Sequence, residues 1–231
     1  MKLNSTDSYW FLGLTALALG YCLLTKTALF ESSVIVTGIL CVALIAIGRK
    51  EGYLFGLYNC AAYAWIAYEN GLFGEVLLNL LFYLPTGVIG FFMWRKREGG
   101  KGVLMRRLSW PTLVKIMGSV LLFVLILGFL LTFFKGQKNP FLDATTNAVG
   151  ICATFLMMYR YAEQWIFYIL LNCITIALWA LRYIDQGTEV DSMIFMWVLF
   201  LANSIFGYVT WSRNTSPNAF ENDYEKRIDL R

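Results

Sequence analysis

The segments EGYLFGLYNC (residues 51–60) and EQWIFYILLNC (residues 163–173) decide the fold, because they are two versions of one pattern. Each carries a Glu two positions before an aromatic residue and ends on Asn-Cys, and matching positions are 112 or 113 residues apart. A second pair follows in the same order, since GFFMW ends at Trp94 and GYVTW ends at Trp211. Self-similarity at a fixed spacing indicates an internal duplication.

The composition places both copies in a membrane. Of the 231 residues, 58% are hydrophobic, 17% are aromatic and only 15% are charged, which excludes a soluble enzyme. Eight apolar blocks are distinguishable, and each is close to the roughly 17 to 25 residues that cross a bilayer as a helix. The blocks are residues 9–24, 31–48, 53–68, 73–94, 112–134, 141–159, 165–181 and 193–211.

The duplication organises these blocks into two three-helix copies, blocks two to four and six to eight, joined by block five. Three crossings and one linker return the second copy in the same orientation, so we predict 3+1+3 parallel repeats about an axis along the membrane normal. The chain is thus predicted to be an all-α polytopic membrane protein with eight transmembrane helices. Its predicted parts are an extra N-terminal helix (1–28), the first repeat (29–97), a basic loop with the linker helix (98–138), the second repeat (139–213) and a tail (214–231).

Basic residues predict the orientation. Positively charged loops resist translocation, which places the stretch 95–115 and both termini in the cytoplasm. Fifteen of the nineteen Lys and Arg residues then lie inside, and Lys26, Lys135, Lys138 and Arg182 lie outside. We interpret the basic stretch as a topology signal, with a nucleic-acid or anionic-lipid patch as the alternative.

The residues that enzymes use for chemistry are scarce. The chain has no histidine, and its five cysteines all lie in apolar blocks without a Cys-x-x-Cys pair. This pattern argues against His-assisted nucleophiles and His- or Cys-ligated metals. We therefore expect no catalytic residue, no metal, no cofactor and no enzyme activity.

Polar and aromatic residues align on one face of block seven, at positions 165, 168, 172, 175 and 179. Such polar groups are costly in a membrane unless a helix or a ligand meets them. We predict that this face and its counterparts bind a planar ligand with a polar edge, the alternative being that each Asn only joins two helices. Trp94 and Trp211 are instead predicted to be anchors in an interfacial aromatic belt. The candidate substrate-binding residues are Trp165, Tyr168, Asn172, Thr175, Trp179, Asn59, Asn79, Tyr83, Trp197, Asn203, Tyr208 and Gln164.

Three sequence motifs resemble the PnuC family of bacterial vitamin transporters, which import nicotinamide riboside. They are F-G-L-x-N at residues 55–59, Y-x-E-x-W-x-x-Y-x-x-x-N at residues 161–172, and the two G-x-x-x-W ends. The family usually has Trp where Tyr168 stands and Gln where this chain has Leu80. The resemblance implies a fold related to SWEET sugar transporters and a homotrimer in the bacterial inner membrane. It also implies import of the riboside, a precursor of NAD, by facilitated diffusion with alternating access, and trapping by cytosolic phosphorylation.

The residues themselves agree with a substrate of this kind. Nicotinamide riboside carries a carboxamide, a ribose and a pyridinium cation, and a fixed cation can be held over a Trp or Tyr ring. Transport of another vitamin such as thiamine or riboflavin satisfies the same reasoning, and a membrane protein with no transport role is a further alternative. The expected partners are the small-molecule substrate and membrane lipid, with no nucleic acid.

The predicted orientation is testable by labelling single cysteines in a cysteine-free background. Gly187→Cys should react with an impermeant thiol reagent added to intact cells, because position 187 is predicted to lie outside. Gly100→Cys should react only after the cells are broken. Labelling of position 100 in intact cells would contradict the orientation.

Overall fold

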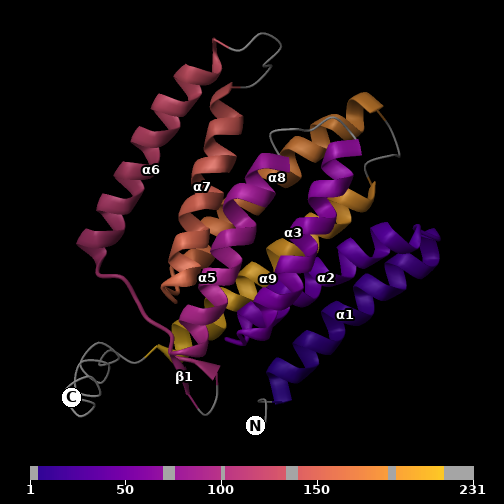
Figure 1. Cartoon of the computed structure of the whole chain (residues 1–231), viewed down its shortest axis with the longest axis horizontal. Helices are drawn as coiled ribbons and strands as arrows, with labels where there is room; N and C mark the ends of the chain where they lie inside the picture. Colours follow the sequence, from indigo (N-terminus) through magenta and orange to yellow (C-terminus); the bar gives the residue numbers. More distant parts are fainter. Residues whose placement is uncertain (1–4, 70–75, 100–101, 134–139, 187–190, 216–231) are drawn as a thin grey trace. The chain divides into compact units, whose positions relative to one another are not determined.

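The computed structural model describes residues 5–69, 76–99, 102–133, 140–186 and 191–215, and these are almost entirely helical (Figure 1). Positions 100 and 187, used in the labelling test, and the tail beyond residue 215 lie outside the described residues. The helical segments are α1 (Ser5–Thr25), α2 (Leu29–Ala46), α3 (Glu51–Glu69), the π-helix η1 (Leu78–Tyr83) continued by α5 (Leu84–Arg95), α6 (Trp110–Leu131), α7 (Pro140–Met158), α8 (Gln164–Gln186) and α9 (Asp191–Asn214). Each predicted block coincides with one of them, so the all-α polytopic fold is confirmed.

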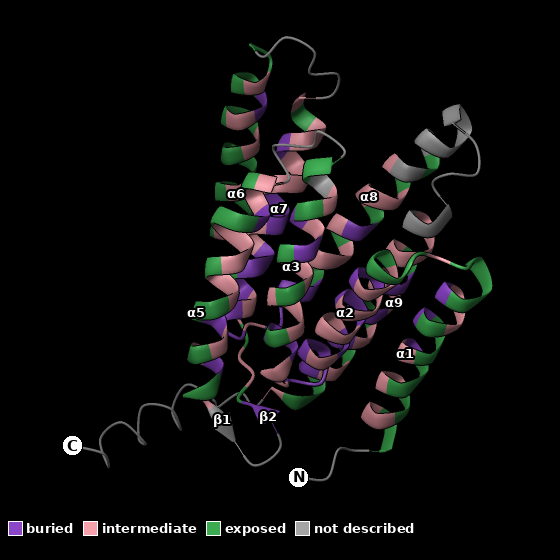
Figure 2. Ribbon diagram, turned by 45° about the vertical axis from the view of Figure 1, so that its right-hand side comes forward, coloured by how far each residue is buried: buried purple, intermediate pink, exposed green. Residues whose placement is uncertain are grey.

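Five of the described helices are long and apolar enough to cross a membrane by length and composition. They are Ser5–Thr25, Leu29–Ala46, Trp110–Leu131, Pro140–Met158 and Ile194–Asn214. In α8 the described apolar part is the shorter segment Gln164–Leu178. Figure 2 shows exposed residues along the length of α6, and only 11% of its apolar window is buried, as expected for a helix that faces lipid.

The chain divides into two compact units. The first contains residues Met1–Met105 with the short pieces Met158–Arg160 and Val209–Asn214, and the second contains the remaining described residues. The division at residue 105 falls in the basic loop between the predicted repeats. The repeat boundaries themselves stay a prediction.

Aromatic residues form the centre of the first unit. The rings of Tyr53 and Trp94 meet edge to face with centroids 5.2 Å apart, and Trp211 lies 5.7 Å from Trp94. The indole N–H of Trp211 donates a hydrogen bond of 2.9 Å to the carbonyl of Ala46. Both tryptophans are 0% exposed, so the prediction that they anchor an interfacial belt is wrong. They are core residues because each ring has protein packed around it.

The second unit packs α6, α7 and α8 around an apolar core. Its buried residues are Val149, Ala153 and Leu156 on α7 and Phe167 on α8. Leu113, Ile116 and Val120 supply the side of α6 that faces this core. Most of the other described residues of α6 are exposed.

The turn before α3 and the turn before α8 share one backbone geometry. Gly48 and Arg160 are 112 residues apart, and both adopt positive φ angles, 73° and 66°. Three pairs of backbone hydrogen bonds match at the same spacing: Arg49 to Leu44 and Tyr161 to Leu156, Gly52 to Arg49 and Gln164 to Tyr161, and Tyr53 to Lys50 and Trp165 to Ala162. These equivalences support the duplication predicted from the sequence.

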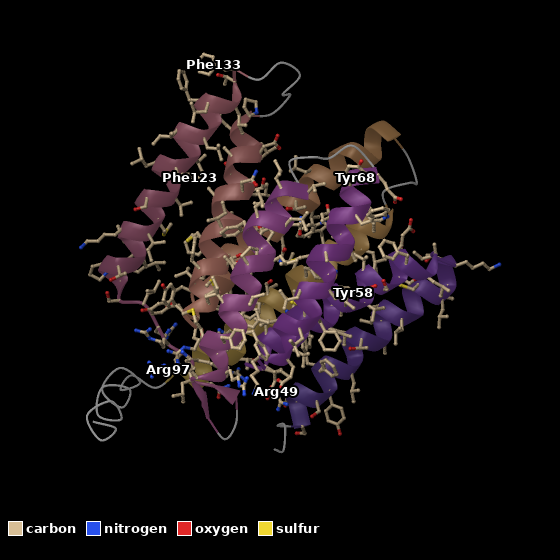
Figure 3. The ribbon with its side chains drawn as sticks, viewed as in Figure 1. Arg49, Tyr58, Tyr68, Arg97, Phe123 and Phe133 are labelled. Carbon is tan, nitrogen blue, oxygen red and sulfur yellow. The ribbon has the colours of Figure 1, made fainter. Side chains whose placement is uncertain are left out.

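The basic loop after α5 contains two short strands, a feature that a topology signal alone does not require. Its strands β1 (Glu98–Gly99) and β2 (Gly102–Val103) pair antiparallel, and the N–H of Val103 donates to the carbonyl of Gly48. Within the first unit, Arg49 and Arg97 lie at one end, and Tyr68 lies near the opposite end of α3 with Tyr58 between (Figure 3). The two labelled arginines of this unit therefore lie at one end of it, and the orientation across the membrane stays a prediction.

A glycine contact in the first unit gives a stability prediction. A Cβ at Gly90 would lie 2.5 Å from the Tyr53 ring, which cannot retreat because Trp94 packs beside it. Gly90→Ala should destabilise the protein by about 1–3 kcal/mol and lower its thermal midpoint in detergent by several degrees.

The matched control is Gly118→Ala, because no atom lies within 4 Å of a Cβ at this helical position. Alanine favours helix there, so its midpoint should be unchanged or slightly raised. Equal midpoints for the two variants would contradict the packing described for Tyr53.

Candidate functional site

The start of α8 in the second unit positions the first candidate residue, Trp165. Its side chain is 2% exposed, and its ring lies against Gly207 of α9. A Cβ at position 207 would come within 2.6 Å of the ring, so only glycine permits this approach. Tyr53 and Gly90 make the equivalent contact in the first unit. The indole is therefore fixed between two helices before any ligand arrives.

Tyr168 follows one turn later on the same face of α8. Its ring centroid is 5.9 Å from that of Trp165, at an interplanar angle of 52°. Its hydroxyl donates a weak hydrogen bond of 3.7 Å to the sulfur of Met157 on α7. Two aromatic rings are thus held together, and Tyr168 is held from the α7 side.

Asn172 begins a buried chain of hydrogen bonds. It is 3% exposed, and its Nδ2 donates a hydrogen bond of 3.0 Å to the hydroxyl of Ser204 on α9. Ser204 in turn donates to the carbonyl of Phe200, 2.8 Å away. Asn203, also predicted as a site residue, is fully buried beside Ser204 in the sequence of α9. Polar groups thus meet between α8 and α9 at the level of Asn172.

Gln164, the first residue of α8, has a different environment. Its side chain is 0% exposed, and neither its Oε1 nor its Nε2 has a hydrogen-bond partner among the described residues. An unpaired buried amide costs about 1–3 kcal/mol. The protein therefore retains a polar group here that its own described atoms do not satisfy.

Glu163 is a residue whose role the sequence analysis missed. Its carboxylate is buried, accepts a hydrogen bond of 3.0 Å from the N–H of Leu108, and lies 3.8 Å from Nε of Arg107. The basic loop is thereby held against the start of α8. The available signal was the Glu that stands two positions before the aromatic residue in both copies.

The remaining candidates of the second unit lie farther along the helices. Thr175 donates to the carbonyl of Leu171 in its own helix, and the Trp197 ring lies 5.5 Å from that of Phe200. Tyr208 is half-buried, and the side chain of Trp179 lies outside the described residues. The structure therefore brings together Trp165, Tyr168 and Asn172, with Gln164 at the start of their helix.

The first unit contains the other three candidates. Asn59 donates from its amide to the carbonyl of Val34 on α2, at 2.6 Å, so this amide joins two helices as in the alternative interpretation. Asn79 is buried within η1, and Tyr83 ends that π-helix half-buried. Whether these three contact substrate stays a prediction.

The π-helix has a local cause. The N–H of Leu84 donates to the carbonyl of Asn79, five residues back, and Pro85 follows with no N–H to donate. The sequence analysis did not predict η1. Single π-helical turns are frequent at functional sites, and this one displays a predicted polar residue.

The chemistry that this arrangement supports is binding. Among the described residues no group of three or more His, Cys, Asp or Glu side chains could hold a metal ion. The face of α8 offers fixed aromatic rings and amides, which suit a planar ligand with polar edges.

Comparisons with known proteins agree with a transport role. A family model described as nicotinamide mononucleotide transporter matches residues 28–213. A nicotinamide riboside transporter PnuC from Neisseria mucosa is 37% identical over 187 residues, covering 77% of this chain and 70% of that protein. The protein of that name from Haemophilus influenzae is 34% identical over 186 residues, covering 77% and 76%. A crystal structure of the vitamin B3 transporter PnuC superposes with a TM-score of 0.79 at 31% identity, covering 92% of each chain.

The hydrogen bond between Asn172 and Ser204 gives a second stability prediction. Hydrogen bonds between membrane helices contribute about 0.6 kcal/mol on average and up to about 1.7 kcal/mol. Ser204→Ala and Asn172→Ala should therefore be non-additive by about that amount in a double-mutant cycle of unfolding in mixed micelles. Additivity within about 0.3 kcal/mol would show that the two side chains do not interact.

Proposed function

This chain belongs to the nicotinamide mononucleotide transporter family, and from this premise we propose that it is a membrane transporter that imports nicotinamide riboside. The resemblance to PnuC transporters found in the sequence is thereby confirmed. We further propose that the riboside binds in the second repeat, on the face of α8 that carries Trp165, Tyr168 and Asn172.

The observation that carries the choice of substrate is the charge of this face. The mononucleotide has a phosphate, which in a dry site requires Lys, Arg or several donors. The apolar part of α8, Gln164–Leu178, has no Lys or Arg, and neither do the described side chains of α9 before Arg213. The riboside lacks the phosphate and needs no such partner, which favours it over the nucleotide in the family description.

The groups of the riboside match the groups on α8. A pyridinium cation gains roughly 0.5–2 kcal/mol over each aromatic face, and Trp165 and Tyr168 lie 5.9 Å apart as two such rings. Asn172 offers an amide at the same level as a serine hydroxyl, with a hydrogen bond of 3.0 Å between them. The hydroxyls of the ribose can form hydrogen bonds with Asn172 and Ser204 in place of the bond between these two side chains.

The transport mechanism that we propose is alternating access by the two repeats without ion coupling. Ion-driven carriers commonly hold the ion on a carboxylate or imidazole in mid-membrane. In the described helices the acidic residues stand in the first or last turn or just before a helix, as with Glu51, Glu69 and Glu163. Net uptake would then depend on phosphorylation of the riboside in the cytosol.

We also propose a setting for the transporter. It would lie in a bacterial inner membrane as a homotrimer, with both termini in the cytoplasm. The arginines at one end of the first unit and the exposed apolar surface of α6 support the proposal that the chain crosses a membrane several times.

Substitutions on α8 test the proposed site. Trp165→Ala and Asn172→Ala should each raise the dissociation constant for nicotinamide riboside about tenfold or more, because each removes a ring or a hydrogen bond worth roughly 1–3 kcal/mol. Isothermal titration calorimetry of the purified protein measures this without depending on tryptophan fluorescence.

Trp110→Ala and Ser119→Ala serve as matched controls on the exposed side of α6. Their dissociation constants should equal that of the wild type. If Trp165→Ala and Asn172→Ala also bind as the wild type does, the substrate binds elsewhere.

Proteoliposomes test the absence of ion coupling. Labelled riboside should equilibrate to equal internal and external concentrations, because no gradient drives it. Accumulation on imposing a pH step or a sodium gradient would contradict the mechanism. A membrane potential must be tested with a neutral analogue, since a cationic substrate redistributes with voltage through any carrier.

A further inference from the structure

Gln164 is a polar group that the described protein does not satisfy. Its amide is fully buried at the first position of α8, and both the donor Nε2 and the acceptor Oε1 lack a hydrogen-bond partner among the described residues. Its backbone is engaged, since its N–H donates to the carbonyl of Tyr161 at 3.2 Å. A buried amide of this kind requires a hydrogen-bond partner other than the described protein atoms.

The neighbours of Gln164 hold it in place. Glu163 is bound by the N–H of Leu108 and lies near Arg107, and Trp165 is packed against Gly207. The backbone on both sides of Gln164 is therefore fixed. A side chain on such a backbone is preorganised for a ligand, because little conformational freedom is lost on binding.

An amide has one hydrogen-bond pattern that no carboxylate shares. It donates through Nε2 and accepts through Oε1, so it forms two reciprocal hydrogen bonds with another primary carboxamide. A carboxylate can only accept hydrogen bonds. One of its oxygens would therefore face the amide oxygen Oε1, which carries partial negative charge and has no proton to donate. A buried amide in a substrate site can therefore distinguish the two groups.

We propose that Gln164 binds the carboxamide of the substrate and selects it against the corresponding carboxylate, an inference that rests on the proposed function. Gln164 is adjacent in the sequence to Trp165, whose ring is the proposed partner of the pyridinium. The carboxamide is a substituent of that same pyridinium, so one turn of α8 recognises both the ring and its polar group. Asn172, two turns farther along α8, is left for the ribose.

Calorimetric titration with nicotinamide riboside and with nicotinic acid riboside tests this assignment. The wild type should bind the carboxamide at least about tenfold more tightly, a difference of about 1.4 kcal/mol. Gln164→Leu should weaken binding of the carboxamide about tenfold or more and change binding of the carboxylate by less than about threefold. Gln164→Glu keeps the acceptor and adds a charge, so it should exclude the carboxylate more strongly than Gln164→Leu does.

Asn147→Leu is the matched control, because it removes an amide of the second unit that donates to Asp143 of its own helix. Asn147→Leu should leave the dissociation constants for nicotinamide riboside and nicotinic acid riboside unchanged. An unchanged preference in Gln164→Leu would overturn the assignment. An equal loss for both ligands would overturn it too, because Gln164 would then bind their common ribose. A wild type that does not bind nicotinamide riboside would instead overturn the proposed function and this assignment with it.

Discussion

In hydrocarbon no solvent satisfies a polar group, and this constraint determines most of what the structure does with its amides and carbonyls. The Asn59 amide finds the carbonyl of Val34, and the indole of Trp211 finds that of Ala46. Those partners belong to the protein, so those groups stabilise the fold. The Gln164 amide has none among the described residues, and we propose that its partner is the substrate.

The two predicted copies use a common plan for different purposes. In each, an aromatic residue at the start of a helix packs on a glycine, Tyr53 on Gly90 and Trp165 on Gly207. The first copy surrounds its aromatic residue with Trp94 and commits Asn59 to α2. The second copy has a serine opposite its asparagine, and a glutamine where the first has Gly52. These substitutions place the amides and the hydroxyl of the proposed site in the second copy.

Much of the fold could be predicted from the sequence, because hydropathy and helical periodicity are local properties of the chain. The eight helical blocks and the face of Trp165, Tyr168 and Asn172 follow from spacing alone. Burial of Trp94 could not be predicted, since a tryptophan near a helix end has the same local pattern in a core and in an interfacial belt. The role of Glu163 was hidden for a related reason, because its partner Leu108 is 55 residues away and supplies a backbone N–H that no sequence pattern displays.

The central claim is that the proposed site accepts the uncharged ribose end of nicotinamide riboside, because the apolar part of α8, Gln164–Leu178, offers no Lys or Arg for a phosphate. Competitive calorimetric titration of the purified wild type with nicotinamide riboside, nicotinamide mononucleotide, thiamine and riboflavin tests it most directly. The account predicts saturable binding of the riboside, with the mononucleotide and the two other vitamins at least about tenfold weaker. Tighter binding of the mononucleotide, thiamine or riboflavin than of the riboside would contradict it.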